Sequence, residues 1–239
     1  MNRGILTTSL VLIGWLAMQA APAAAQNHVV NGSFEDGKLT QGTGNNVHLM
    51  SLPPGATTIL NWTVEGAELA WAETGNHYVN PASNGNRFLD LTGFHDSRPY
   101  GAVRQTINGL RPSLTYELSL DLGTDQAQSA YSGPIAVDVM VENGTTITKT
   151  CASNPPPNSG VVWERCAFRF VAQAPDATIH ITGKTGKQYI GIDNVSVTYV
   201  SPIPRWVNQF VLPAVIVVLA LFVLLAFVLF VQRSSAHGA

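Results

Sequence analysis

The chain has few of the features that mark nucleic-acid-binding or catalytic proteins. Only 12% of its 239 residues are charged, and 13 basic residues are balanced by 15 acidic ones. This balance leaves no basic patch for a phosphate backbone, so we expect no nucleic-acid partner. No nucleophile-elbow or zinc-helix motif occurs, and the histidines are scattered without the spacing of metal ligands. We therefore expect a protein that is not an enzyme.

Cysteine is scarce, because Cys151 and Cys166 are the only two. An even number of cysteines in an exported chain favours a disulfide, and two free thiols are the alternative. The two residues flank a proline-rich loop between strand-like runs. We therefore expect the bond to close a hairpin.

Both ends of the chain are apolar. Residues 1–25 combine a basic start, an apolar run and small residues before Gln26, as in a secretory signal peptide; an uncleaved anchor is the alternative. Residues 210–231 carry no charged side chain and match the roughly 20 residues of a single transmembrane helix. We expect an exported, membrane-anchored protein with an extracytoplasmic domain at 26–201, a juxtamembrane linker at 202–209 and a cytoplasmic tail at 232–239.

Between these ends, apolar and polar residues alternate with the period of a β-strand. No amphipathic helix is evident, and Gly and Asn mark turns between the runs. Many short strands without helices predict an all-β sandwich or jelly roll. The predicted strands cover residues 29–34, 58–64, 69–72, 87–91, 102–107, 116–122, 135–141, 166–170, 179–182 and 190–199.

Two local features refine this prediction. Asn143-Gly144 stands between two alternating runs and indicates a tight hairpin. In the last strand the apolar residues change from even to odd positions, which predicts a bulge at Asp193-Asn194. The alternative is that pairing simply ends there.

Several segments resemble one group of domains. They are V-V-N-G-S-F-E-D-G at 29–37, G-N-R-F-L-D-L-T-G at 85–93, G-A-V-R-Q-T-I at 101–107, the strand at 116–123, and I-D-N-V-S-V at 192–197. In this order they resemble the galactose-binding-like β-sandwich domains of the DUF642 family and of bacterial choice-of-anchor surface proteins. The resemblance implies a galactose-binding-like jelly roll.

The resemblance also implies a structural Ca²⁺ ion where the first and last strands meet. Glu35 and Asp193 match the acidic positions of these domains, with backbone carbonyls near Asn31 and Ser33 as further ligands. Calcium prefers six to eight oxygen ligands of these kinds. The alternative is that both acids are surface carboxylates beside turns.

A sugar site needs aromatic faces and a few hydrogen-bonding groups. Trp62, Trp71 and Trp163 are aromatic candidates, although tryptophan in such a domain is more often part of the core. The favoured hypothesis is a non-catalytic surface module that binds extracellular or cell-wall polysaccharide. A structural or adhesive protein is the alternative, followed by a small glycan hydrolase. The residues expected to bind the ligand are Tyr78, Arg87, Asp90, Tyr100, Arg104 and Gln105.

Overall fold

The computed structural model describes residues 26–40, 48–74, 81–125, 133–156, 159–187, 189–202 and 207–236. Residues 26–200 form one compact unit, and the C-terminal residues from 201 onward belong to a second one. The predicted signal peptide, residues 1–25, lies outside the described residues.

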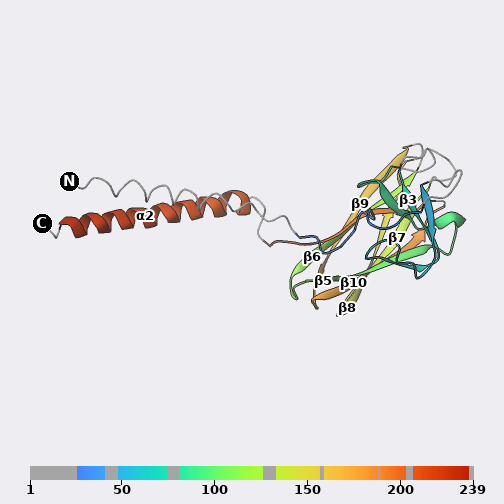
Figure 1. The fold of residues 1–239 in the computed structure, drawn as a ribbon, viewed down its shortest axis with the longest axis horizontal. Helices are drawn as coiled ribbons and strands as arrows, with labels where there is room; N and C mark the ends of the chain where they lie inside the picture. Colours follow the sequence, from blue (N-terminus) through green and yellow to red (C-terminus); the bar gives the residue numbers. More distant parts are fainter. Residues whose placement is uncertain are drawn as a thin grey trace. The chain divides into compact units, whose positions relative to one another are not determined.

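The first unit is a sandwich of two antiparallel sheets (Figure 1). One sheet has six strands, in the order β1 (Leu49–Leu52), β3 (Leu69–Glu73), β4 (Arg87–Asp90), β11 (Gly191–Tyr199), β6 (Thr115–Asp125) and β9 (Val161–Val171). The other has five, in the order β2 (Thr63–Gly66), β5 (Gly101–Asn108), β10 (Asp176–Thr185), β7 (Ile135–Asn143) and β8 (Thr145–Ser153). The predicted all-β sandwich is confirmed.

Alternation explains how each strand contributes to the core. Leu118, Leu120 and Leu122 of β6 are buried between the sheets, whereas the residues between them face outward. Val137 and Val139 of β7 do the same from the opposite sheet. Side chains from two inner faces interdigitate in this way in aligned sandwiches. Outward-facing positions are therefore where a surface site has to be sought.

The predicted hairpin and bulge are both confirmed. β7 ends at Asn143 and β8 begins at Thr145, so Gly144 alone forms the turn, with a φ of 73°. The pairing of β11 with β6 shifts register between Asp193 and Ser196. The predicted strand at 29–34 is wrong, because this segment turns rather than extends.

The disulfide is confirmed, but the hairpin that it was expected to close is not. Cys151 and Cys166 are bonded, with 5.8 Å between their Cα atoms. Cys151 lies on β8 and Cys166 on β9, which are edge strands of opposite sheets. The bond therefore joins the two sheets along one side of the sandwich.

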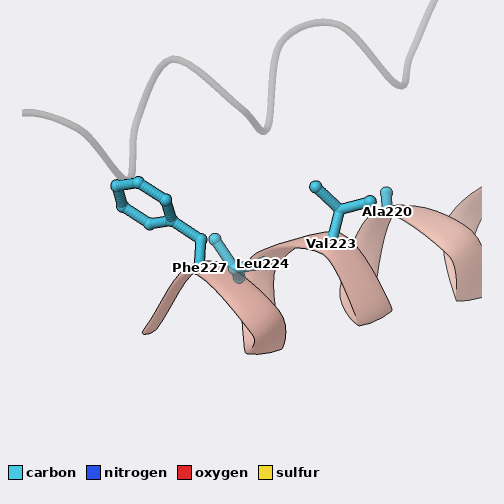
Figure 2. Close-up of a pocket in the computed structure, with 4 residues that line it drawn as sticks. All are labelled: Ala220, Val223, Leu224 and Phe227. Carbon is cyan, nitrogen blue, oxygen red and sulfur yellow. The ribbon is translucent and has the colours of Figure 1, made fainter. Parts of the chain in front are cut away.

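The second unit contains the helix α2 (Leu212–Ala236), preceded by a π-helical turn at Val207–Val211. Its apolar side chains are largely exposed. Figure 2 shows four of them, which line an apolar pocket on α2: Ala220, Val223, Leu224 and Phe227.

The predicted membrane span at residues 210–231 is not confirmed. Among the residues that the structure describes, no helix has both the length and the apolarity that crossing a bilayer requires.

Candidate functional site

The residues predicted to bind a ligand do not lie together. Arg104 is on the outer face of the five-stranded sheet, where its Nε lies 2.8 Å from Oε1 of Glu65. The neighbouring Gln105 is buried, and its side-chain amide bonds both the backbone N–H and the carbonyl of Val30, at 2.9 and 2.8 Å. Gln105 therefore attaches the N-terminal segment to β5. Tyr78 lies outside the described residues.

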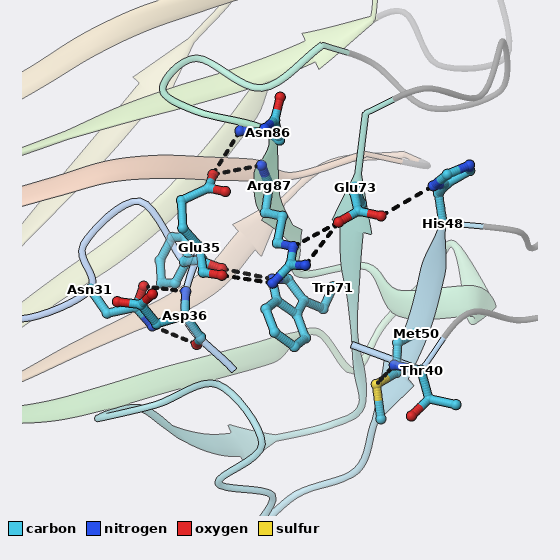
Figure 3. A network of polar contacts seen from close by, with 11 residues as sticks. Asn31, Glu35, Asp36, Thr40, His48, Met50, Trp71, Glu73, Asn86 and Arg87 are labelled. Atoms are coloured by element: carbon cyan, nitrogen blue, oxygen red, sulfur yellow. Dashed lines mark hydrogen bonds and ion pairs between the residues drawn. The ribbon is translucent and has the colours of Figure 1, made fainter. Parts of the chain in front are cut away.

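Arg87, another residue expected to bind a ligand, is hydrogen-bonded to other parts of the protein (Figure 3). Its Nε and Nη2 donate to Oε1 of Glu73 at 3.0 and 2.8 Å, and its Nη1 donates to the carbonyl of Glu35 at 2.6 Å. The guanidinium lies 5.0 Å from the ring centroid of Trp71, within cation–π range. These contacts join the N-terminal segment to β3 and β4.

Tyr100 fastens two loops together. Its hydroxyl donates to the carbonyl of Gly186 at 2.6 Å, and the guanidinium of Arg98 lies 5.6 Å from its ring centroid. Arg98 also donates to the carbonyl of Lys184 at 2.9 Å. Because the hydroxyl is already engaged, Tyr100 orders the loop that precedes β5.

Asp90 faces outward from β4 but is only 5% exposed. Its Oδ1 accepts bonds from the backbone and hydroxyl of Thr92, at 3.0 and 2.9 Å, and from the backbone of Ile190 at 3.0 Å. Burial raises the pKa of Asp90 to about 7, although these hydrogen bonds favour the charged form. Asp90 therefore gains a proton as the pH falls through about 7.

Glu35 and Asp193, expected to bind calcium, accept hydrogen bonds from backbone amides instead. Oε1 of Glu35 accepts from Asn86 and Arg87 at 2.7 and 2.8 Å. The oxygens of Asp193 accept from the amides of Asn84, at 2.7 Å, and Asn194, at 2.6 Å. These N–H groups compete with a cation for Oε1 of Glu35 and for both oxygens of Asp193.

Asn31, another expected ligand, also has hydrogen-bond partners within the protein. The side-chain oxygen of Asn31 accepts the amide of Asp36 at 2.9 Å, and its carbonyl accepts the indole N–H of Trp62 at 2.9 Å. Ser33 follows in the same turn. Within the described ranges, no three His, Cys, Asp or Glu side chains are grouped so that they could hold a metal ion. Calcium remains a prediction from the resemblance.

Asp193 is fully buried next to Asp121 on the outer face of the six-stranded sheet. Burial, with a smaller contribution from the charge of Asp121, raises the pKa of Asp193 to about 7. The N–H bonds from Asn84 and Asn194 act in the opposite direction. Asp121 itself accepts the Ser83 hydroxyl at 2.5 Å.

Trp163 lies across the same outer face, over two glycines. It is opposite Gly123 of β6, which in turn is opposite Gly191 of β11. A Cβ added to Gly123 would lie 2.3 to 2.5 Å from three atoms of the indole, and one added to Gly191 would lie 3.0 Å from it. The face of the indole therefore covers Gly123, and only residues without a side chain permit this placement.

The indole is supported from the side and remains partly exposed. Phe88 meets it edge to face, with centroids 5.5 Å apart and an interplanar angle of 78°. The indole N–H donates to the carbonyl of Pro81 at 2.9 Å. Phe88 and Trp163 belong to a small apolar cluster, separate from the main core, that also contains Leu49, Ala72, Ala82 and Tyr189.

Polar groups lie beside the indole on the same face. Arg165, two residues further along β9, has a side chain that is 53% exposed. Its Nη2 donates to the Ser119 hydroxyl at 2.6 Å, and its Nη1 lies 3.7 Å from Oδ1 of Asp121. An aromatic plane next to an exposed guanidinium and hydroxyl groups can bind a ligand that is apolar on one side and polar at its edge.

Sequence reasoning named Trp163 as an aromatic candidate but did not place it. Gly123 follows directly after the predicted strand at 116–122, and Gly191 lies in the last predicted strand. Their alignment with Trp163 depends on β6 lying between β11 and β9. The register of strands far apart in sequence is not visible from alternation alone.

The comparisons with solved structures give similar proteins at low identity. A TmCBM61 structure in complex with beta-1,4-galactotriose has a TM-score of 0.47 and 11% identity, covering 74% of this chain and 100% of that chain. The CBM22-1 xylan-binding domain of Paenibacillus barcinonensis Xyn10C has a TM-score of 0.44 and 14% identity, covering 77% and 100%. No curated protein matches the chain.

A family model gives the assignment. The model described as "Protein of unknown function (DUF642)" matches residues 27–198. This match covers most of the chain and includes every segment on which the resemblance was based. The chain belongs to the DUF642 family.

Proposed function

We propose that this protein is a non-catalytic carbohydrate-binding module and that Trp163 is its stacking platform. The observation that carries the proposal is the partly exposed indole lying over Gly123 and Gly191 on the outer face of the six-stranded sheet. One side of a pyranose ring presents C–H groups that pack against an aromatic plane, while its hydroxyls need hydrogen-bonding partners. Arg165 offers such a partner two residues away.

The carboxyl groups near the indole support a binding role rather than hydrolysis. Glycoside hydrolysis needs one carboxyl group as an acid and another as a base or nucleophile. Asp90 and Asp193 are buried, and each accepts several hydrogen bonds from the protein. Asp121 is bonded to Ser83 and Asn194. These groups order the protein around the platform.

The sequence adds a cellular setting to the proposal. The leader predicted at residues 1–25 and the disulfide both suit an exported domain in an oxidising compartment. Polysaccharide outside the cell is then the ligand class to test. Attachment to a membrane through residues 210–231 stays a prediction from the sequence.

A glycan array tests the proposal directly. The wild-type chain is expected to bind one class of polysaccharide, and Trp163→Ala is expected to weaken that binding at least tenfold, or about 1.4 kcal/mol. Phe94→Ala is a matched control, because Phe94 is an aromatic residue that is 43% exposed in the turn before β5.

The folded state of each variant would be checked by circular dichroism before the array is read. Unchanged binding by Trp163→Ala would refute the platform. If a folded wild-type chain binds no polysaccharide, the structural or adhesive alternative becomes the better hypothesis.

A further inference from the structure

The loop at residues 81–86 is held at two places by carboxylates that come from distant parts of the chain. Asp193 of β11 accepts the backbone N–H of Asn84 at 2.7 Å. Glu35 of the N-terminal segment accepts the N–H groups of Asn86 and Arg87 at 2.7 and 2.8 Å, as Figure 3 shows. The two acids together therefore fix the turn that leads into β4.

Close packing makes this arrangement specific. Gly85, with a φ of 75°, lies between the two held positions, and a Cβ there would be 2.3 Å from Oε1 of Glu35. Arg87 donates to the carbonyl of Glu35 at 2.6 Å and so fixes the acid itself. Direct bonding thus accounts for the order of the loop.

The same loop contacts the platform. The carbonyl of Pro81 accepts the indole N–H of Trp163 at 2.9 Å. Ala82, the next residue, packs against the small cluster of Ala72 and Phe88, as Trp163 does. A displacement of the loop would remove a hydrogen bond from the indole and a packing contact from the cluster against which the indole packs.

We infer that Glu35 and Asp193 are positioning residues that clamp the loop at 81–86 directly, and through it hold the indole of Trp163 in place. The role in sugar binding rests on the proposed function; the effect on the indole does not. The resemblance assigns both acids to calcium, whereas here their oxygens meet backbone N–H groups. The clamp is expected to work in the same way with and without calcium.

Fluorine NMR of the full chain labelled with 5-fluorotryptophan tests the clamp without needing a sugar. The chain has five tryptophans, and Trp163→Phe identifies the resonance of Trp163. Asp193→Ala and Glu35→Ala are expected to shift or broaden that resonance and to weaken glycan binding about tenfold. Asp193→Asn keeps an oxygen acceptor for the N–H of Asn84. It is expected to leave the Trp163 resonance and glycan binding close to those of the wild type.

The matched control is Asp138→Asn on the other sheet, which also removes a carboxylate that accepts two hydrogen bonds. It is expected to leave the Trp163 resonance and glycan binding unchanged. The inference is overturned if both alanine variants keep the wild-type Trp163 resonance. It is also overturned if calcium moves this resonance in the wild type, EDTA reverses the change, and Glu35→Ala abolishes it. A shifted resonance in a chain that binds no glycan would support the clamp and refute the proposed function.

Discussion

The two outer faces of the sandwich differ in the burial of their carboxyl groups. On the six-stranded sheet, Asp90 and Asp193 are buried and meet backbone N–H groups, beside an indole that lies over glycines. On the five-stranded sheet, charged side chains reach solvent and pair with one another, as Arg169 and Glu117 also do on the six-stranded sheet. Exposed pairs contribute little to stability, whereas buried carboxyl groups depend on every hydrogen bond that they receive.

The five-stranded face shows the consequence of this difference. Glu65 contacts both Arg104, at 2.8 Å, and Nδ1 of His180, at 2.9 Å. Lys184 contacts Asp138 at 2.9 Å. The side chains named here pair with one another across the sheet. The six-stranded face instead exposes an aromatic plane, and for this reason we place the binding site there.

The largest effect expected from this comparison is a pH dependence on the six-stranded face. The pKa of Asp90 rises from 3.8 in the unfolded chain to about 7 in the folded one. Between these values the folded state binds a proton that the unfolded state lacks, so stability falls as pH rises from about 4 to about 7. The full shift corresponds to about 4 kcal/mol.

Urea unfolding at several pH values would measure the contribution of Asp90 to the pH dependence of stability. Asp90→Asn is expected to flatten the decline in the free energy of unfolding between pH 5 and pH 8. This holds even if the substitution also changes the free energy of unfolding by the same amount at every pH. Asp193 contributes a decline of the same sign, so some slope is expected to remain. Parallel pH profiles for the wild type and Asp90→Asn would contradict the assignment.

The next effect concerns the bond that joins the two sheets. Cys151 and Cys166 are 15 residues apart, and a loop of this size is stabilised by about 3 kcal/mol on the chain-entropy model. Replacing both with Ser is expected to lower the free energy of unfolding by about this amount, as measured in urea. Hydrogen exchange is expected to increase in both β8 and β9. An unchanged unfolding midpoint after the replacement would show that packing alone joins the edges.

A methyl group under the indole is expected to have a smaller effect. Gly123→Ala places a carbon where the ring of Trp163 now lies, and overpacking of this kind costs about 1–3 kcal/mol. Thermal unfolding and glycan binding would both be measured. Ala152→Ser is the control, because it adds one atom at an exposed position of β8, where changes usually stay within about 0.5 kcal/mol. Equal effects of the two substitutions would show that the indole is not confined by Gly123.

The smallest effect is expected on the five-stranded face. The Asp138 side chain is 34% exposed. Partial burial acts to raise its pKa, but the hydrogen bonds from Thr150 and Lys184 lower it. Asp138→Asn is expected to cost less than about 1 kcal/mol, because solvent screens exposed pairs. Urea unfolding at low and high salt would measure the cost and its screening. A cost as large as that of the disulfide would refute the contrast between the two faces.

The sequence predicted the strands best where one side of a strand is buried. The run from Tyr116 to Leu122 alternates strictly, and β6 follows it. The segment at 29–34 is apolar in places but turns, because Asn31 and Phe34 adopt φ values of 54° and 58°. Alternation describes a strand's faces and carries no information about such backbone conformations.

The candidate site depended on relations that a sequence does not display. Gln105 and Arg87 looked suitable for a ligand, yet both bind other parts of the chain. Trp163 gained its role from Gly123 and Gly191, which lie about 30 to 40 residues away and align only through sheet order. The residue types indicated that a sugar could be bound, but the pairing of strands distant in sequence determined where the candidate site lies.

The position of β11 has a mechanical consequence. β11 is the last strand before residue 201, and it lies between β4 and β6 rather than at an edge. A force applied to the chain beyond residue 200 therefore acts along a strand that is bonded on both sides. If a ligand held Trp163 on β9, the force would pass from β9 through β6 to β11. It would act along the strands, so the hydrogen bonds between β9 and β6 and between β6 and β11 would resist it together.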